Sequence, residues 1–197
     1  MTSATCVSGA KRDCAKPGEH YIYVYWNQPD GKLHREGCGA DTVHEMMLYM
    51  EQCISEFAAS VEDTLVIVTA DHGHLDTEHV VLQDYPQLTD CLKRLPSLEP
   101  RVLNLFVKEE KKEFFVNEWN RLFGDRFVLM PVEEVISRQL MGTGKPHPMF
   151  RSMLGDYLAI ATGDLTVFYY GSNYFVSNHG SLTEDEMLIP LIVFDGR

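Results

Sequence analysis

Apolar residues in this chain form short continuous runs that alternate with stretches of helical periodicity. The clearest run covers residues 64–70, TLVIVTA, in which five of seven residues are apolar. A short run of this kind is typical of a strand buried on both faces. Aromatic and β-branched residues predict further strands at 21–26, 102–107, 126–130, 157–161, 165–170 and 188–194.

Two stretches place apolar residues along one face of a helix. The first begins at Asp41 or Thr42, where Thr42 and Glu45 have the spacing of a capping box, and the second covers residues 111–123. The apolar stripe of the first helix contains Val43, Met46, Met47, Met50, Ile54 and Phe57. Shorter helices are predicted at residues 88–95 and 132–140.

Two segments are predicted to be loops. Residues 1–19 are small and polar and are expected to be a ragged start, and residues 27–39 contain several glycines and a proline. In the remaining chain, strands alternate with helices. This order predicts an α/β fold with a mostly parallel sheet flanked by helices.

Composition and charge limit the partners of the chain. A length of 197 residues is enough for one domain with a substantial core, and the 45% of hydrophobic and 23% of charged residues are ordinary globular values. The net charge of −12 argues against binding along a nucleic-acid backbone, which needs clustered Lys and Arg. A small phosphorylated substrate stays compatible with this charge, because a local metal ion can offset it.

The cysteines and the hydropathy pattern bear on the cellular compartment. The five cysteines are odd in number and include no C-x-x-C pair, which favours reduced thiols in a cytoplasmic protein over a disulfide framework. No run approaches the roughly 18 apolar residues of a membrane span, so no membrane association is expected.

Candidate chemistry gathers in loops beside the predicted strands. Asp71 and His72 directly follow the apolar run, and ligands of open α/β sheets collect beyond such strand ends. The loop after residue 26 contains Asp30 and His34, and His179 shortly precedes the last strand. Two carboxylates and three imidazoles approach the ligand set of a two-zinc hydrolytic site.

The motifs around these residues resemble the alkaline phosphatase superfamily, most closely its type I phosphodiesterase/nucleotide pyrophosphatase branch. The resemblance is carried by residues 23–34 with Gly37, by 64–73 (TLVIVTADHG) and by 178–192 (NHGSLTEDEMLIPLI). It extends over most of residues 20–197, including the tripeptide 99–101 and the segment 154–157. It implies that residues 20–197 are the C-terminal part of an alkaline phosphatase-like catalytic domain whose N-terminal half is absent.

The resemblance also implies a site for two divalent metal ions. Asp30, His34 and His179 match the three ligands of one ion, and Asp71 and His72 match two ligands of the other. Zinc is the expected metal, with manganese as an alternative. His74 also lies in this segment, and we expect it to lie beside the site or in solvent rather than to bind metal.

The chain departs from the family pattern at its start. In the family, a further aspartate and a Thr or Ser nucleophile precede the region equivalent to residues 21–26, whereas only twenty residues precede it here. Thr2, Ser3, Thr5 and Ser8 lack the preceding strand and aspartate and are poor candidates for the nucleophile. The sequence therefore predicts a fragment with about one complete metal site and very low turnover. Ser181 replaces a frequent glycine, with little expected effect.

Several alternatives stay open from the sequence. Another superfamily activity, such as that of a sulfatase or a phosphate mutase, would differ chiefly in the absent half. A metal-stabilised binding domain without turnover is a second alternative, and a metal-free α/β domain is a third. Loss of half of a sheet would also expose an apolar edge, which predicts a homodimer.

Overall fold

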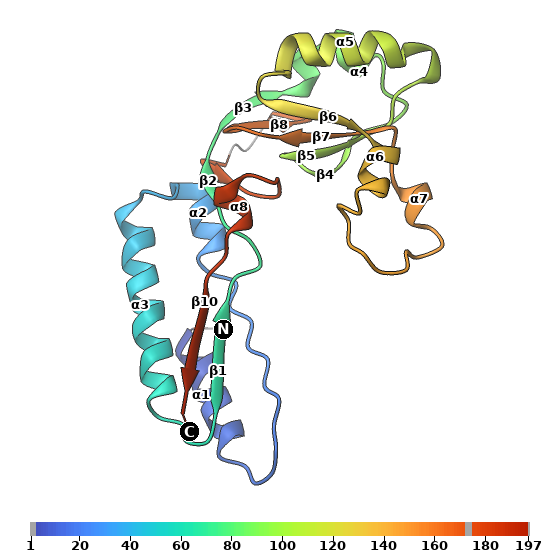
Figure 1. Ribbon diagram of the computed structural model, residues 1–197. Helices are drawn as coiled ribbons and strands as arrows, with labels where there is room; N and C mark the ends of the chain where they lie inside the picture. Colours follow the sequence, from blue (N-terminus) through green and yellow to red (C-terminus); the bar gives the residue numbers. More distant parts are fainter. Residues whose placement is uncertain (1–2, 172–174, 197) are drawn as a thin grey trace. The chain divides into compact units, whose positions relative to one another are not determined.

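The computed structural model describes residues 3–171 and 175–196 and divides the chain into two compact units. The terminal unit contains the chain up to Gly73 and from Leu188 onward, and the central unit contains His74–Met187. Figure 1 shows the elements of both units. None of the helices described is both long and apolar enough to span a membrane.

The terminal unit combines three helices with a two-stranded ribbon. The helices are α1 (Ser3–Cys14), α2 (Asp30–Glu36) and α3 (Asp41–Ala58), and the antiparallel strands are β1 (Leu65–Thr69) and β10 (Leu191–Asp195). Helix α1 packs against α3, where Ala10 and Val43 are buried. The other predicted stripe residues of α3 are half-buried, except for Met47, which is exposed.

One face of the β1–β10 ribbon is apolar and exposed. Ile67 pairs with Val193, and their side chains are 56% and 52% exposed. Leu65 and Leu191 belong to the same face and are also more than half exposed. The continuous apolar run of β1 is thus exposed at alternate positions, although its composition suits a strand buried on both faces.

The central unit is built on a four-stranded antiparallel sheet. The strands are β4 (Ser97–Glu99), β5 (Val102–Leu105), β7 (Tyr157–Ala161) and β6 (Phe127–Pro131), in that spatial order. Helix α5 (Lys112–Phe123) covers one face, where Phe115, Trp119 and Phe123 form the main core (Figure 1). Helix α6 (Val132–Ser137) packs on the other face against Leu158 and Ile160. Alternation of buried residues along β7 therefore serves two separate cores.

Short elements complete the central unit. They are β2 (Leu75–Asp76), β3 (Glu78–Val81), η1 (Leu82–Asp84), α4 (Pro86–Thr89), η2 (Glu109–Lys111), α7 (Phe150–Met153), β8 (Leu165–Phe168), β9 (Ser177–Asn178) and α8 (Glu184–Met187). Strand β2 pairs with β9 in antiparallel orientation, and β3 pairs with β8 in parallel orientation.

The α/β class is confirmed, but the expected strand direction is wrong for the described residues. Apart from β3–β8, the paired strands in the described part of the chain are antiparallel. An apolar run indicates how deeply a strand is buried, and it carries no information on the direction of its neighbour. The direction depends on how the intervening chain returns to the sheet.

Residues 21–26 were expected to form a strand and are instead irregular. Tyr21, Tyr23 and Tyr25 are exposed, at 92%, 75% and 63%. Aromatic β-propensity reflects packing on a paired, half-buried surface, and this segment has no partner strand among the described residues. The strand prediction was therefore wrong for lack of a neighbour.

The two predicted loops each contain a helix. Residues 1–19 include α1, whose last turn carries Lys11 and Arg12 and which is docked on α3 through Ala10. Residues 27–39 include α2. The predicted capping box of α3 is also wrong, because the Thr42 hydroxyl donates to the Glu36 carboxylate at the end of α2.

Gly155 is expected to be indispensable for the junction of β5 and β7. A Cβ atom at this position would lie 2.2 Å from the Leu105 carbonyl oxygen, so Gly155→Ala should lower the free energy of unfolding by about 1–3 kcal/mol or more. Gly144→Ala is the matched control, because a Cβ atom there meets nothing within 4 Å. Equal urea midpoints for the two variants would contradict this assignment.

Candidate metal centre

Asp30 and His34 lie one turn apart on α2, in the terminal unit. The helix follows Pro29 and ends at Gly37, whose φ of +88° favours glycine and whose N–H donates to the Leu33 carbonyl. The imidazole Nε2 of His34 lies 3.3 Å from the Asp30 carboxylate. Side chains four residues apart share a helix face, so both can offer ligand atoms to one ion.

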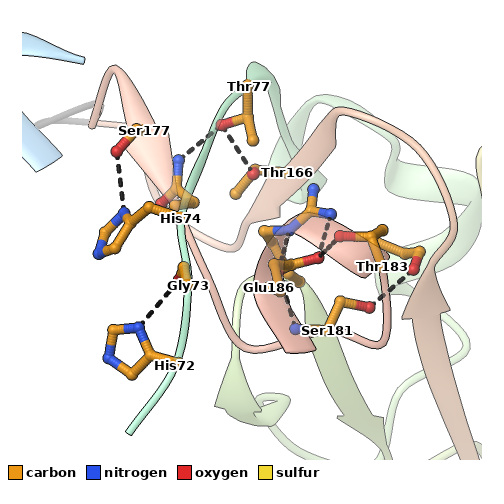
Figure 2. A network of polar contacts seen from close by, with 12 residues as sticks. His72, Gly73, His74, Thr77, Thr166, Ser177, Ser181, Thr183 and Glu186 are labelled. Atoms are coloured by element: carbon orange, nitrogen blue, oxygen red, sulfur yellow. Dashed lines mark hydrogen bonds and ion pairs between the residues drawn. The ribbon is translucent and has the colours of Figure 1, made fainter. Parts of the chain in front are cut away.

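Asp71 and His72 follow β1 directly, as the sequence predicted. The Nδ1–H of His72 donates to the Gly73 carbonyl at 3.0 Å (Figure 2), which leaves Nε2 as the ring nitrogen with a lone pair. This Nε2 lies 3.7 Å from the Asp71 carboxylate. A ligand atom of His72 and one of Asp30 also lie within 4.8 Å of each other.

His179 directly follows β9, in the central unit. Its ring packs edge-on against that of His74, with 4.9 Å between the ring centroids. His74 in turn shares a hydrogen bond of 2.9 Å between its Nδ1 and the Ser177 hydroxyl (Figure 2). Sequence reasoning expected His74 beside the site or in solvent, and the structure places it beside the candidate ligand His179.

The turn that carries His179 is held on both sides. Before it, the Asn178 amide donates to the Thr77 hydroxyl at 2.6 Å. After it, the Ser181 N–H donates to Glu186 at 2.9 Å, and the Ser181 hydroxyl donates to the Ala161 carbonyl at 2.7 Å. Ser181, which departs from the family pattern, therefore anchors this turn to β7.

Gly180 lets the turn fold closely onto the neighbouring strand. Its φ is +110°, and a Cβ atom there would lie 3.0 Å from the side chain of Glu99. Glycine adopts this backbone conformation without steric cost, and its lack of a side chain allows the close approach. The glycine of the His179-Gly180 motif thus has a backbone role.

A buried ion pair between Arg101 and Glu186 supports the turn that carries His179. Arg101 donates through Nε and Nη2 to the Glu186 carboxylate at 2.6 and 2.8 Å, and both side chains are at most 1% exposed. The guanidinium also donates to the carbonyls of Gly163 and Leu165. Figure 2 shows Glu186 together with its contacts to Ser181 and Thr183.

The acidity of Glu186 reflects these contacts. Burial alone would raise its pKa, but the hydrogen bonds from Arg101, from Thr183 and from the Ser181 N–H outweigh this effect and hold the pKa below its ordinary value. Glu186 is therefore a buried, charged anchor that accepts hydrogen bonds from Arg101, Thr183 and Ser181. Nothing in the sequence pattern links it to Arg101, which lies 85 residues away.

The candidate ligands are divided between the two units. The terminal unit holds Asp30, His34, Asp71 and His72, and the central unit holds His179 with His74. Carboxylate oxygens and neutral imidazoles suit zinc and similar divalent ions. The hydrogen bonds of His72 to a carbonyl and of His74 to a hydroxyl are the kind that orient metal-binding imidazoles, so the residue types fit such an ion.

The poor nucleophile candidates lie at the start of the chain. The backbone of Ser3, Thr5 and Ser8 belongs to α1, and Thr2 lies outside the described residues. A helix here replaces the expected loop.

Known structures of the same fold span about twice the length of this chain. Murine ectonucleotide pyrophosphatase/phosphodiesterase 5 matches with a TM-score of 0.66 and 17% identity over 98% of this chain and 52% of its own. Human ectonucleotide pyrophosphatase/phosphodiesterase 5 matches with a TM-score of 0.66 and 16% identity. This match covers 86% of the present chain and 46% of the human chain. Phosphonoacetate hydrolase from Sinorhizobium meliloti 1021 matches with a TM-score of 0.59 and 16% identity. This match covers 81% of the present chain and 42% of the hydrolase chain. The fold is therefore that of the alkaline phosphatase superfamily, over part of the domain.

The sequence itself gives the family. No protein of curated function matches the chain. The family profile described as type I phosphodiesterase / nucleotide pyrophosphatase matches residues 7–181, which is most of the chain and includes every candidate ligand. The chain belongs to the type I phosphodiesterase/nucleotide pyrophosphatase family.

Proposed function

We propose that this chain is the metal-binding half of a hydrolase that cleaves phosphodiester or pyrophosphate bonds, with phosphomonoesters as an alternative substrate class. The observation that carries the proposal is the family match over residues 7–181, a stretch that contains Asp30, His34, Asp71, His72 and His179. The family match favours these substrates over the sulfate esters or phosphate transfers of other superfamily members.

We assign Asp30, His34 and His179 to one metal ion and Asp71 and His72 to a second. The assignment rests on residue type and order along the chain, and it is supported within the terminal unit by the 3.3 Å contact between Asp30 and His34. Zinc is the proposed metal, with manganese as the alternative. Two bound ions would activate a nucleophile and stabilise charge on the phosphoryl oxygens.

We place the nucleophile and the remaining ligands of the second ion outside this chain. The chain spans 42–52% of the length of the structures named above, and the family's nucleophile precedes the region that resembles residues 21–26. By itself the chain would then hold about one complete metal site and show very low turnover.

We propose a small phosphorylated compound as substrate. Murine ectonucleotide pyrophosphatase/phosphodiesterase 5 has been solved in complex with AMP, and the phosphonoacetate hydrolase in complex with phosphonoformate. Both ligands are small anions. The net charge of −12 on this chain disfavours long nucleic acids and is compatible with a substrate whose charge a metal offsets.

A reducing, cytoplasmic compartment is proposed for the chain. The odd number of cysteines supports it, together with the absence of a disulfide among the described Cys14, Cys38, Cys53 and Cys91. Thiol titration of the denatured protein, purified anaerobically and without added reductant, tests it. Five titratable thiols per chain are expected, and a paired set would argue for an oxidising compartment.

We further propose that the chain alone forms a homodimer through the apolar face of the β1–β10 ribbon. Ile67 and Val193 lie opposite each other on this face and are both more than half exposed. Ile67→Lys should shift sedimentation from dimer to monomer, whereas Leu98→Lys, an exposed apolar position of the central unit, should not. A monomer mass that is independent of concentration would contradict the proposal.

The metal content of the purified chain tests the proposed function. About one Zn²⁺ per chain is expected after extensive dialysis, because the Asp30–His34–His179 set is the complete one. Inductively coupled plasma mass spectrometry measures zinc and manganese together. The double variant Asp30→Ala/His179→Ala should lose the ion.

The control variant replaces an acid and a histidine that have no assigned role. Asp84→Ala/His44→Ala removes one exposed side chain of each type and should retain the metal. No metal in the unaltered chain, even after zinc is added back, would overturn the proposal. Equal loss in both double variants would show that binding is not specific to the assigned ligands.

A further inference from the structure

An open cavity of about 370 Å³ lies at one end of the four-stranded sheet, within the central unit. This volume is in the range of small-molecule sites, roughly 300–1,000 Å³. One wall ends at Asp156, which directly precedes β7, whereas the turn that carries His179 is anchored at Ala161, the last residue of β7. The cavity and that turn therefore lie at opposite ends of β7.

Backbone hydrogen bonds hold the three walls of the cavity together. The segment with Lys93 and Arg94 is fixed beyond the end of β5, because the Lys93 N–H donates to the Phe106 carbonyl at 2.7 Å. The wall that ends at Asp156 is tied to the same strand, since the Asp156 N–H donates to the Leu105 carbonyl at 2.8 Å. The shape of the cavity is thus set by the fold and needs no ligand to form.

The lining of the cavity is positively charged, although the chain has a net charge of −12. Lys93, Arg94 and Arg151 line it together with a single acid, Asp156. The Asp156 carboxylate contacts Lys93 at 3.3 Å and Lys112 at 2.8 Å. Burial would raise the pKa of Asp156, but hydrogen bonds from these lysines and from a backbone N–H hold it below its ordinary value. This acid is therefore balanced by the two lysines and leaves the charge of Arg94 uncompensated.

The guanidinium of Arg94 is held in place by an aromatic ring. Its Cζ lies 3.5 Å from the centroid of the Phe106 ring, which is a cation–π contact. Arg94 makes no hydrogen bond or ion pair to any residue that the structure describes. Arg151, by contrast, donates to Glu133 at 2.7 Å. A guanidinium positioned in this way can direct two parallel N–H groups at a phosphate.

We propose that this cavity binds the phosphate group of a small organic phosphate monoester, with Arg94 as the principal donor. Lys93 and Arg151 add positive charge, and the half-buried Phe106 and Leu154 offer apolar surface to the organic part. Three cations favour a phosphate monoester, with a charge of about −1.5 to −2 at neutral pH, over a singly charged carboxylate. The residues involved all belong to the central unit, so the inference does not rest on the proposed metal centre.

Isothermal titration calorimetry of the metal-free full chain tests the proposal, with AMP and inorganic phosphate as separate probes. AMP is expected to bind, and Arg94→Met should weaken its binding by about 10–100-fold, because charged donors are lost. Arg94→Lys keeps the charge without the planar fork and should recover only part of the affinity. Tighter binding of AMP than of inorganic phosphate would support an organic ligand. Equal affinities would overturn that part of the proposal and identify free phosphate as the ligand.

A matched variant and a direct readout separate this site from general charge effects. Arg121→Met removes an exposed arginine elsewhere in the central unit and should leave the affinity for AMP unchanged. In ¹H–¹⁵N spectra of the unaltered chain, AMP should shift the Nε–H signal of Arg94, and circular dichroism verifies that each variant is folded. An unshifted Arg94 signal, an unchanged affinity in Arg94→Met, or an equal loss in Arg121→Met would overturn the proposal.

The failure of the proposed function has a different result. A chain that binds no zinc but binds AMP through Arg94 would refute the metal centre and leave this inference intact. A chain that binds zinc at the assigned ligands but binds neither AMP nor phosphate at Arg94 would refute this inference alone.

Discussion

Replacing Arg101 with methionine is expected to lower the free energy of unfolding of the central unit by about 3–5 kcal/mol. The substitution keeps much of the side-chain volume but leaves the Glu186 carboxylate buried without its counter-charge. Urea denaturation followed by fluorescence measures the change. In a Trp26→Phe background the signal comes from Trp119, in the core of the central unit.

An exposed ion pair is the control for this prediction. Arg121 contacts Glu118 three residues away on α5 and is 62% exposed, so Arg121→Met should cost less than about 1 kcal/mol. The double variant Arg101→Met/Glu186→Met should recover much of the lost stability, because it removes both buried charges. Similar urea midpoints for Arg101→Met and Arg121→Met would refute the anchoring role of the buried pair.

The same ion pair has a defined pH dependence. The pKa of Glu186 in the folded protein lies below the ordinary value of 4.5 for Glu. Its contribution to stability is therefore fully present above pH 4.5 and is lost as the pH falls through the lower, folded value. Stability measured from pH 7 downward should fall more steeply in the unaltered protein than in Glu186→Gln. Parallel curves would contradict the assignment.

Saturation with Zn²⁺ is expected to stabilise the chain by about 2.7–4.1 kcal/mol at 100 to 1,000 times the dissociation constant. The ion would bind the folded ligands and not the unfolded chain, so binding shifts the equilibrium toward the folded state. For a chain of this length the corresponding rise in Tm is about 5–15 °C. Scanning calorimetry with zinc and with a chelator measures it.

The double variant Asp30→Ala/His179→Ala controls for unspecific effects of zinc. Its Tm should be the same with zinc and with chelator, because two of the three assigned ligands are missing. An equal rise in the variant would show that zinc acts elsewhere, for example on exposed thiols such as Cys38. No rise in the unaltered chain would contradict a metal site that forms in the chain alone.

Predictions from the sequence were most accurate for elements whose local apolar pattern coincides with a paired strand or a packed helix. Strand β7 was predicted with its observed bounds, and β5 and helix α5 to within a few residues. The apolar periodicity of these three elements is a local property of the sequence, and it matches the residues that are buried when the sheet and the helix pack together. Residues 21–26 have an equally strong strand composition, but the described residues provide no neighbouring strand, and the segment is irregular.

The candidate site shows the same difference between what local sequence predicts and what depends on distant segments. The sequence identified Asp30, His34, Asp71, His72 and His179 because their motifs are local, and the family match over residues 7–181 covers all of them. It placed His74 beside the site or in solvent but did not predict its contact with His179, since that contact depends on the register between β2 and β9, about a hundred residues apart. Arg101 and Glu186 were overlooked as a pair for the same reason.

The sequence by itself determined the family, the α/β class and the candidate ligands, because residue types and short-range spacing carry that information. Only the tertiary structure decided the strand directions and the helix α2 that contains Asp30 and His34. It also decided that Ile67 and Val193 lie on an exposed face and that His74 contacts His179. These features depend on which distant segments meet, and short-range periodicity along the chain does not encode that choice.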